Sequence, residues 1–277
     1  MSHAERRSAE GKAGTLSFLD WPGAGRATPV LYLHPVNTAA AVWSSVVAEL
    51  DGPGRALAVD YRAHGGSEAG APYYPADYAA DALAVLDAAG ARRAHVVCGS
   101  IGGAVAVELA AAAPERVASI VAFGATLRLG WDTALLDETE ADLRAFGVRD
   151  WFARHAGDIL GPASRPDAAA RLVELASVGR DGDRDLDTVV EVLRTTFGLA
   201  DSRAAAVAVA TDPPPARVFV GEYDPTCPLP MAEELAAGLR ADVHTMPGIG
   251  HLPMLEDPAG TTVAIRAFHA EIGQGAE

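Results

Sequence analysis

The stretch AHVVCGSIGGAVAVELAAAA, from Ala94 to Ala113, decides the fold. Its first residues, 94–98, predict a buried strand, and the residues from Ile101 onward predict a helix that ends before a proline. Only a tight turn fits between the two. A serine at such a turn, here Ser100, projects its hydroxyl above the carboxyl edge of a sheet, and the positions two before and two after it have to be small. Cys98 and Gly102 occupy those positions.

Strand-like and helix-like runs alternate on both sides of this stretch. Further strands are predicted at Thr15–Trp21, Pro29–His34, Arg55–Asp60, Val117–Phe123, Arg217–Gly221 and Asp242–Met246. Helices are predicted at Ala39–Leu50, Ala76–Ala89, Pro230–Leu239 and Thr262–Ile272, with Thr38 as a candidate cap for the first of them. This rhythm predicts an α/β fold with a mostly parallel central sheet and helices on both faces.

The alternation lapses between residues 128 and 210. That segment has a helical and polar character, holds Trp131 and Trp151, and includes the charged run GRDGDRD at 179–185. We therefore predict a core domain made of residues 1–127 and 211–277, with residues 128–210 as a helical cap inserted between two strands.

Composition excludes several classes of protein. The 277 residues are 49% hydrophobic and 21% charged, which is enough to bury a large core. The formal charge of −15 disfavours nucleic acid and anionic membranes as partners. Two isolated cysteines, Cys98 and Cys227, predict neither a disulfide scaffold nor a zinc site. Residues 1–14 lack the apolar core of a signal peptide and no apolar run has membrane-spanning length, so we expect a cytoplasmic protein of undetermined oligomeric state.

A serine hydroxyl needs a base and an orienting acid to become a nucleophile. His251 stands in a glycine-rich loop after the predicted strand ending at Met246 and is the candidate base. Two acids, Glu222 and Asp224, follow the strand 217–221. The order serine, acid, histidine is the one that hydrolases with a nucleophile on a strand-to-helix turn use. The alternative interpretation of the glycine-rich stretch around Ser100 is a flexible turn without a catalytic role. A nucleotide site is disfavoured, because the first strand-to-helix turn lacks the glycine spacing of such a site.

Five stretches together resemble the α/β-hydrolase superfamily over nearly the whole chain: LYLHPVN (31–37), VDYRAHGGS (59–67), VVCGSIGG (96–103), VGEYDPTCP (220–228) and GIGHLPMLEDP (248–258). The resemblance implies a triad of Ser100, His251 and Asp224, because the family places its acid at the aspartate of G-E-x-D. Glu222 is then a solvated or loop-binding carboxylate.

The same resemblance implies an oxyanion hole. One N–H donor is that of Ile101, directly after the nucleophile, and the other comes from the loop after the strand 29–34. Relatives usually have His-Gly there, whereas this chain has His34-Pro35. Proline has no N–H, and the family pattern assigns the second donor to Val36.

Further residues are candidates for the substrate pocket, with core packing as the alternative for each aromatic one: His34, Asn37, Trp43, Trp131, Trp151, Phe152 and Leu252. His64 is expected to bind loop backbone rather than act as a base. Cys98 is expected to be inert beneath the nucleophile, and Cys227 either lines the pocket or belongs to a loop.

The implied chemistry is acyl transfer through an acyl-enzyme, without a metal or cofactor. The stretch HPVNTAAAVW (34–43) is similar to lactone and enol-lactone hydrolases, so a small-molecule carboxylic ester or lactone is the leading substrate. C–C bond hydrolases, thioesterases and cofactor-free haloperoxidases share the triad and stay as alternatives. A ligand-binding relative without turnover is the non-enzymatic alternative.

Overall fold

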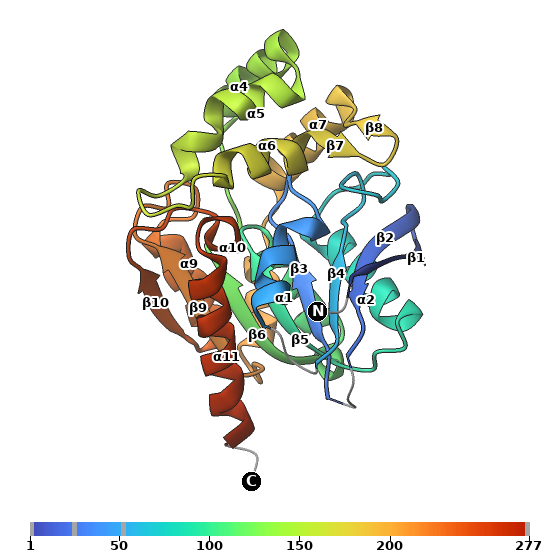
Figure 1. The fold of residues 1–277 in the computed structure, drawn as a ribbon, viewed down its shortest axis with the longest axis vertical. Helices are drawn as coiled ribbons and strands as arrows, with labels where there is room; N and C mark the ends of the chain where they lie inside the picture. Colours follow the sequence, from blue (N-terminus) through green and yellow to red (C-terminus); the bar gives the residue numbers. More distant parts are fainter. Residues whose placement is uncertain (1–2, 24–26, 51–53, 275–277) are drawn as a thin grey trace.

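The strand that leads to Ser100 lies inside an eight-stranded sheet (Figure 1). The structure is a computed structural model that describes residues 3–23, 27–50 and 54–274. The strand order is β1-β2-β4-β3-β5-β6-β9-β10; β1, β2 and β4 are joined by antiparallel pairing and all other pairs are parallel. The strands are β1 Glu5–Gly11, β2 Gly14–Trp21, β3 Val30–Leu33, β4 Ala56–Val59, β5 Ala94–Gly99, β6 Val117–Phe123, β9 Ala216–Gly221 and β10 Asp242–Met246.

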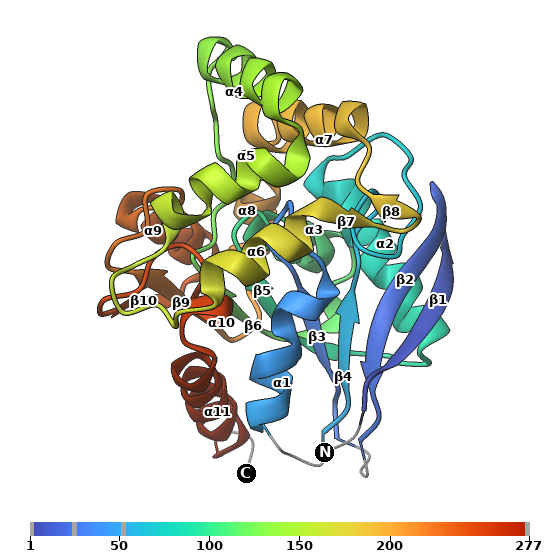
Figure 2. The same ribbon diagram turned by 45° about the horizontal axis from the view of Figure 1, so that its top comes forward.

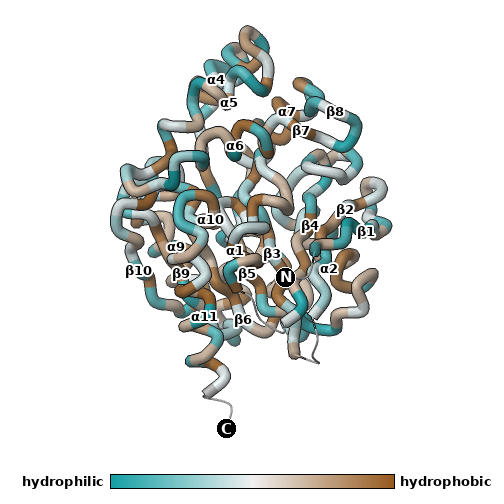
Figure 3. The backbone as a smooth tube through the Cα atoms, in the orientation of Figure 1, coloured by the Kyte–Doolittle hydropathy of each residue, from teal (hydrophilic) through white to brown (hydrophobic). Residues whose placement is uncertain are grey.

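Helices cover both faces of this sheet. They are α1 Ser44–Leu50, α2 Pro75–Ala88, α3 Gly102–Ala112, α8 Arg203–Val209, α9 Leu229–Leu239, α10 Pro253–Glu256 and α11 Pro258–Gln274. Successive strand residues alternate between two cores. In β5, Val96 and Cys98 join the core with α2, α3, α8 and α9, whereas Val97 joins the core with α1 and α11. Figure 3 shows brown, hydrophobic segments along the central strands.

Most of the segment between β6 and β9 forms a layer beyond one end of the sheet, at the top of Figures 1 and 2. We call it the inserted layer. It contains α4 Thr133–Phe146, α5 Val148–His155, α6 Ala168–Ser177, the hairpin β7 Val178–Gly179 and β8 Gly182–Asp183, and α7 Leu186–Leu193. The four helices share a small hydrophobic core that includes Leu143, Phe152 and Val189. The following helix, α8, instead packs against α3 and α9, so this last part of the range 128–210 helps to cover the sheet.

The predicted fold class is confirmed, and the strands 117–123 and 242–246 have the predicted bounds. β1 was not predicted, because its side chains are mostly polar and only Ala9 is buried. Thr38 does not cap the following helix. Its hydroxyl donates to the Pro35 carbonyl instead, and a 3₁₀ turn at Ala40–Trp43 precedes α1.

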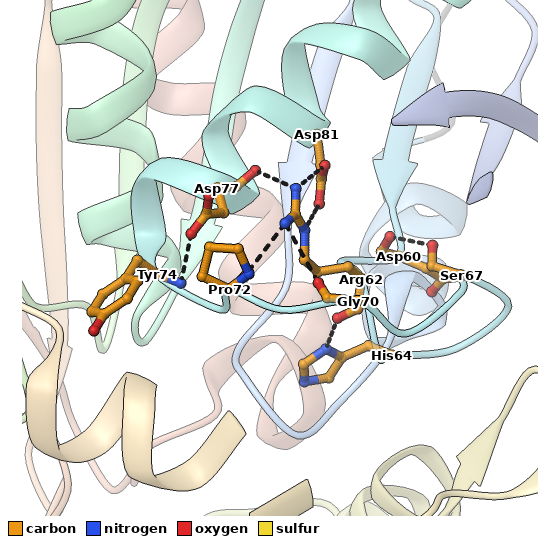
Figure 4. Close-up of polar contacts among 9 residues, drawn as sticks. All are labelled: Asp60, Arg62, His64, Ser67, Gly70, Pro72, Tyr74, Asp77 and Asp81. Atoms are coloured by element: carbon orange, nitrogen blue, oxygen red, sulfur yellow. Dashed lines mark hydrogen bonds and ion pairs between the residues drawn. The ribbon is translucent and has the colours of Figure 1, made fainter. Parts of the chain in front are cut away.

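A buried ion pair organises the connection from β4 to α2, which carries His64 (Figure 4). Arg62 Nε and Nη2 donate to the two carboxylate oxygens of Asp81, both at 2.7 Å, and the two side chains are 2% and 1% exposed. Arg62 Nη1 also donates to the Pro72 carbonyl at 3.0 Å. The guanidinium therefore joins α2 to the loop before it.

Asp81→Leu is expected to destabilise the protein by about 3–5 kcal/mol, because it leaves the Arg62 guanidinium buried without an anion. The double variant Arg62→Met/Asp81→Leu should recover most of this loss, since no unpaired charge remains. Urea unfolding followed by circular dichroism measures both. Arg171→Met, which removes a surface ion pair to Glu174, is the control and should not shift the midpoint. A double variant no more stable than Asp81→Leu would contradict this account.

Candidate active site

Ser100 occupies the strained turn between β5 and α3. Its φ is +55°, a left-handed conformation that non-glycine residues rarely adopt. Its N–H donates to the Phe123 carbonyl at 3.2 Å, and its carbonyl accepts from Thr126 N at 3.2 Å. A Cβ atom at position 102 would lie 3.3 Å from the Cβ of Cys98, so both positions need small residues. The turn is thereby held with the serine side chain above the sheet.

His251 connects Ser100 to Asp224. Its Nε2 lies 3.0 Å from Ser100 Oγ, and its Nδ1 lies 3.0 Å from both carboxylate oxygens of Asp224. A carboxylate only accepts hydrogen bonds, so Nδ1 carries the hydrogen, and in the neutral ring Nε2 accepts from the serine hydroxyl. All three residues are buried, which weakens competition from bulk water.

The environment of Asp224 favours its ionised form. Burial opposes ionisation, but His251 and the N–H groups of Cys227 and Thr226, which donate to Oδ1 at 2.8 and 2.9 Å, hold the pKa of Asp224 below its ordinary value. The neighbouring acid, Glu222, is exposed and accepts from the N–H of Gly248 at 2.9 Å. The carboxylate at hydrogen-bonding distance from the histidine ring is therefore that of Asp224.

Two backbone N–H groups next to Ser100 lack a protein acceptor. Among the described residues, neither Val36 N nor Ile101 N donates a hydrogen bond. Val36 belongs to the loop after β3, and the next residue, Asn37, has a φ of +59°. Such strained residues gather at functional sites.

Two buried histidines hold this loop. His34 Nε2 accepts from Tyr61 N at 3.1 Å while its Nδ1 donates to the Pro35 carbonyl at 2.7 Å. His64 Nε2 accepts from Asn37 N at 3.1 Å. Burial lowers the pKa of His34 to about 4 and that of His64 well below its ordinary value. Both rings are neutral at pH 7 and link the loop after β3 to the loop after β4.

Arg184, from the hairpin of the inserted layer, contacts the same loop. Its Nη1 donates to Asn37 Oδ1 at 3.0 Å, and burial lowers the pKa of its guanidinium to about 10. In the sequence this arginine is distinguished only as part of the charged run 179–185. Nothing in the sequence indicates that the hairpin folds back onto the loop after β3.

A cavity of about 260 Å³ lies between Ser100 and the inserted layer. Of the residues predicted for the pocket, Asn37, Trp131, Trp151, Phe152 and Leu252 line it. His34 and Trp43 do not: His34 holds the loop beneath, and Trp43 is fully buried against Tyr32, with ring centroids 5.2 Å apart. Other residues that line the cavity, mostly from helices between β6 and β9, were not predicted from the sequence: Thr38, Leu143, His155, Ala156, Asp158, Ile159, Leu172, Val189, Leu193, Phe197 and Thr226.

Both cysteines are buried with free thiols. Burial raises the pKa of Cys98, and burial together with the charge of Asp224 raises that of Cys227. In the described part of the chain, no group of three or more His, Cys, Asp or Glu side chains is arranged to hold a metal ion. The described helices include none with the length and apolarity to cross a membrane.

Residues 21–265 match the family described as the alpha/beta hydrolase family, and the chain belongs to that family. The predicted resemblance is thereby confirmed, and the chain is a hydrolase of this family. The 2-hydroxymuconate semialdehyde hydrolase of Pseudomonas sp. (strain CF600) is 30% identical over 271 residues, which cover 94% of this chain and 92% of that one. A candidate carbamate hydrolase, RutD, of Variovorax paradoxus (strain S110) is 29% identical over 88% of this chain and 92% of its own.

A solved structure shares the fold at lower identity. The enol-lactonase from Burkholderia xenovorans LB400 superposes with a TM-score of 0.82 and 22% identity, over 95% of this chain and 100% of that one. At this identity the likeness concerns the fold.

Acid is expected to destabilise the protein through its buried histidines. An unfolded histidine binds a proton near pH 6.5, but folded His34 does so only near pH 4. The contribution of His34 is therefore complete above pH 6.5 and declines as the pH falls to 4, by about 3 kcal/mol. Urea unfolding at several pH values should show a flatter decline for His34→Gln than for wild type. Exposed His244→Gln is the control; equal slopes for wild type and His34→Gln would contradict the prediction.

Proposed function

We propose that this chain is a serine hydrolase that cleaves a small-molecule carboxylic ester or lactone. The observation that carries the proposal is the continuous contact from Ser100 Oγ through His251 to Asp224, beside two N–H groups without acceptors. A nucleophile, a base oriented by an acid, and two oxyanion donors are the parts that acyl transfer needs.

In the proposed mechanism, Ser100 attacks the substrate carbonyl while His251 Nε2 takes its proton. Asp224 keeps Nδ1 protonated and stabilises the imidazolium. The N–H groups of Val36 and Ile101 stabilise the oxyanion. His251 returns the proton to the leaving alkoxide, and a water activated by the same histidine then releases the acid from the acyl-enzyme.

The cavity supports an apolar acyl or alkyl group as the part of the substrate beyond the carbonyl. In the proposal α4–α7 act as a cap, and their lining side chains are largely aliphatic and aromatic, including Trp131, Trp151 and Phe152. A volume of about 260 Å³ suits a small substrate rather than a long acyl chain. The enol-lactonase neighbour has the same fold, which is compatible with a lactone but does not select it.

Cleavage of a C–C bond is the second candidate, because the relative at 30% identity is a hydrolase of 2-hydroxymuconate semialdehyde. C–C bond hydrolysis attacks an aldehyde or ketone carbonyl in place of an ester, so a panel of p-nitrophenyl esters, small lactones and vinylogous 1,5-diketones separates the two. Hydrolysis of thioesters tests the thioesterase alternative, and a peroxidative halogenation assay tests the haloperoxidase alternative. Binding of all these compounds without turnover would favour a ligand-binding relative.

Ser100→Ala is expected to abolish p-nitrophenyl butyrate hydrolysis, because no other described group occupies the nucleophile position. Asp224→Asn should lower kcat by about 10³- to 10⁴-fold, since an amide no longer holds the imidazole in the required tautomer. Steady-state kinetics on folded variants measures both effects.

Glu222→Gln is the matched control, because this acid lies two residues from Asp224 but its carboxylate hydrogen-bonds, within the described part of the chain, only to the Gly248 N–H. It should keep kcat within about twofold of wild type. A larger loss in Glu222→Gln than in Asp224→Asn would assign the acid to Glu222. Full turnover in Ser100→Ala would overturn the proposed function.

A further inference from the structure

Glu256, the last residue of α10, is a buried carboxylate without a cationic partner among the described residues. Its exposed fraction is 2%. Instead of a cation, four donors converge on it: three backbone N–H groups and one hydroxyl. Burying a carboxylate is costly unless hydrogen bonds stabilise it, so this arrangement constrains the segments that supply the donors.

Two of the donors flank His251. Gly250 N donates to Glu256 Oε2 at 2.8 Å, and Leu252 N donates to Oε1 at 2.7 Å. The carboxylate therefore holds the backbone on both sides of the histidine whose ring contacts Ser100.

The other two donors come from the inserted segment. Gly161 N and Ser164 Oγ donate to Glu256 Oε2 at 2.7 and 2.6 Å. One carboxylate oxygen thus accepts from both the histidine loop and the segment between α5 and α6. α10 also packs against α6, below it in Figure 2.

The same segment binds the histidine loop directly. His251 N donates to the Ile159 carbonyl at 2.7 Å, and Ala163 N donates to the Gly248 carbonyl at 2.9 Å. A Cβ atom at position 161 would lie 2.3 Å from the Gly248 oxygen, and one at position 250 would lie 2.4 Å from the Ile159 oxygen. The two backbones meet too closely for side chains, which makes their relative position a fixed feature.

We infer that Glu256 is a positioning residue for His251, which it fixes to the inserted layer at the same time. The inference rests on the proposed function, because it requires His251 to be the base. The carboxylate sets the backbone from which the imidazole projects, and with it the position of the ring relative to the serine hydroxyl.

Glu256→Gln tests this assignment. A glutamine offers one acceptor oxygen, so in either orientation its NH₂ group faces a donor and the histidine loop must shift. We expect kcat for p-nitrophenyl butyrate to fall by about 10- to 100-fold while KM changes little.

Glu222→Gln is the control, since it removes a carboxylate that binds the same loop from the exposed side. Both its kcat and its KM should match wild type. Ser164→Ala removes only the hydroxyl donor and should lower kcat by about threefold. It tests the same inference if Glu256→Gln does not fold.

A folded Glu256→Gln variant with wild-type kcat overturns the inference. If that variant does not fold, an unchanged kcat in Ser164→Ala overturns the inference and a reduced kcat supports it. A loss of stability without any change in kcat also overturns it, because the residue is then only structural. Turnover in Ser100→Ala would instead show that the proposed function has failed, whatever Glu256→Gln does.

Discussion

The crowded turn at Ser100 is the constraint on which the rest of the site depends. A φ of +55° at a non-glycine residue persists only when the surrounding structure enforces it. Here β6 enforces it through the Phe123 carbonyl, and the small residues Cys98 and Gly102 let β5 approach α3. The turn sets the serine hydroxyl above the sheet and frees the Ile101 N–H at the same point.

Other segments are placed relative to that turn by buried polar contacts. His34 and His64 hold the loop that carries the Val36 N–H, and Glu256 holds the loop that carries His251. These side chains lie outside the cavity, yet each hydrogen-bonds to the backbone of a loop that lines or supports the cavity. Buried polar groups that are fully hydrogen-bonded favour one arrangement over others, which suits a site that needs its geometry before the substrate arrives.

The sequence predicted the sheet well because parallel strands buried on both faces are short apolar runs with turn residues between them. It predicted the candidate triad because the three residues follow strand ends, where parallel strands gather their loops. β1 was not predicted, because an edge strand with one buried residue has no apolar pattern. Arg184 was not predicted as a site residue, because its partner Asn37 lies 147 residues away. Glu256 was not predicted either, because its contact with the inserted segment, at Gly161, spans 95 residues. Trp43 was a pocket candidate, but a tryptophan near a site loop and one in the core have the same sequence signal.

Covalent labelling tests the central claim, that Ser100 is the nucleophile, most directly. The protein is treated with a fluorophosphonate, digested with trypsin and mapped by mass spectrometry, with residual esterase activity measured in parallel. Cleavage after Arg93 and Arg116 releases a peptide in which Ser100 is the only serine. We expect a single adduct at Ser100 and a loss of activity in proportion to it. An adduct at another residue, or activity that survives complete modification of Ser100, would contradict it.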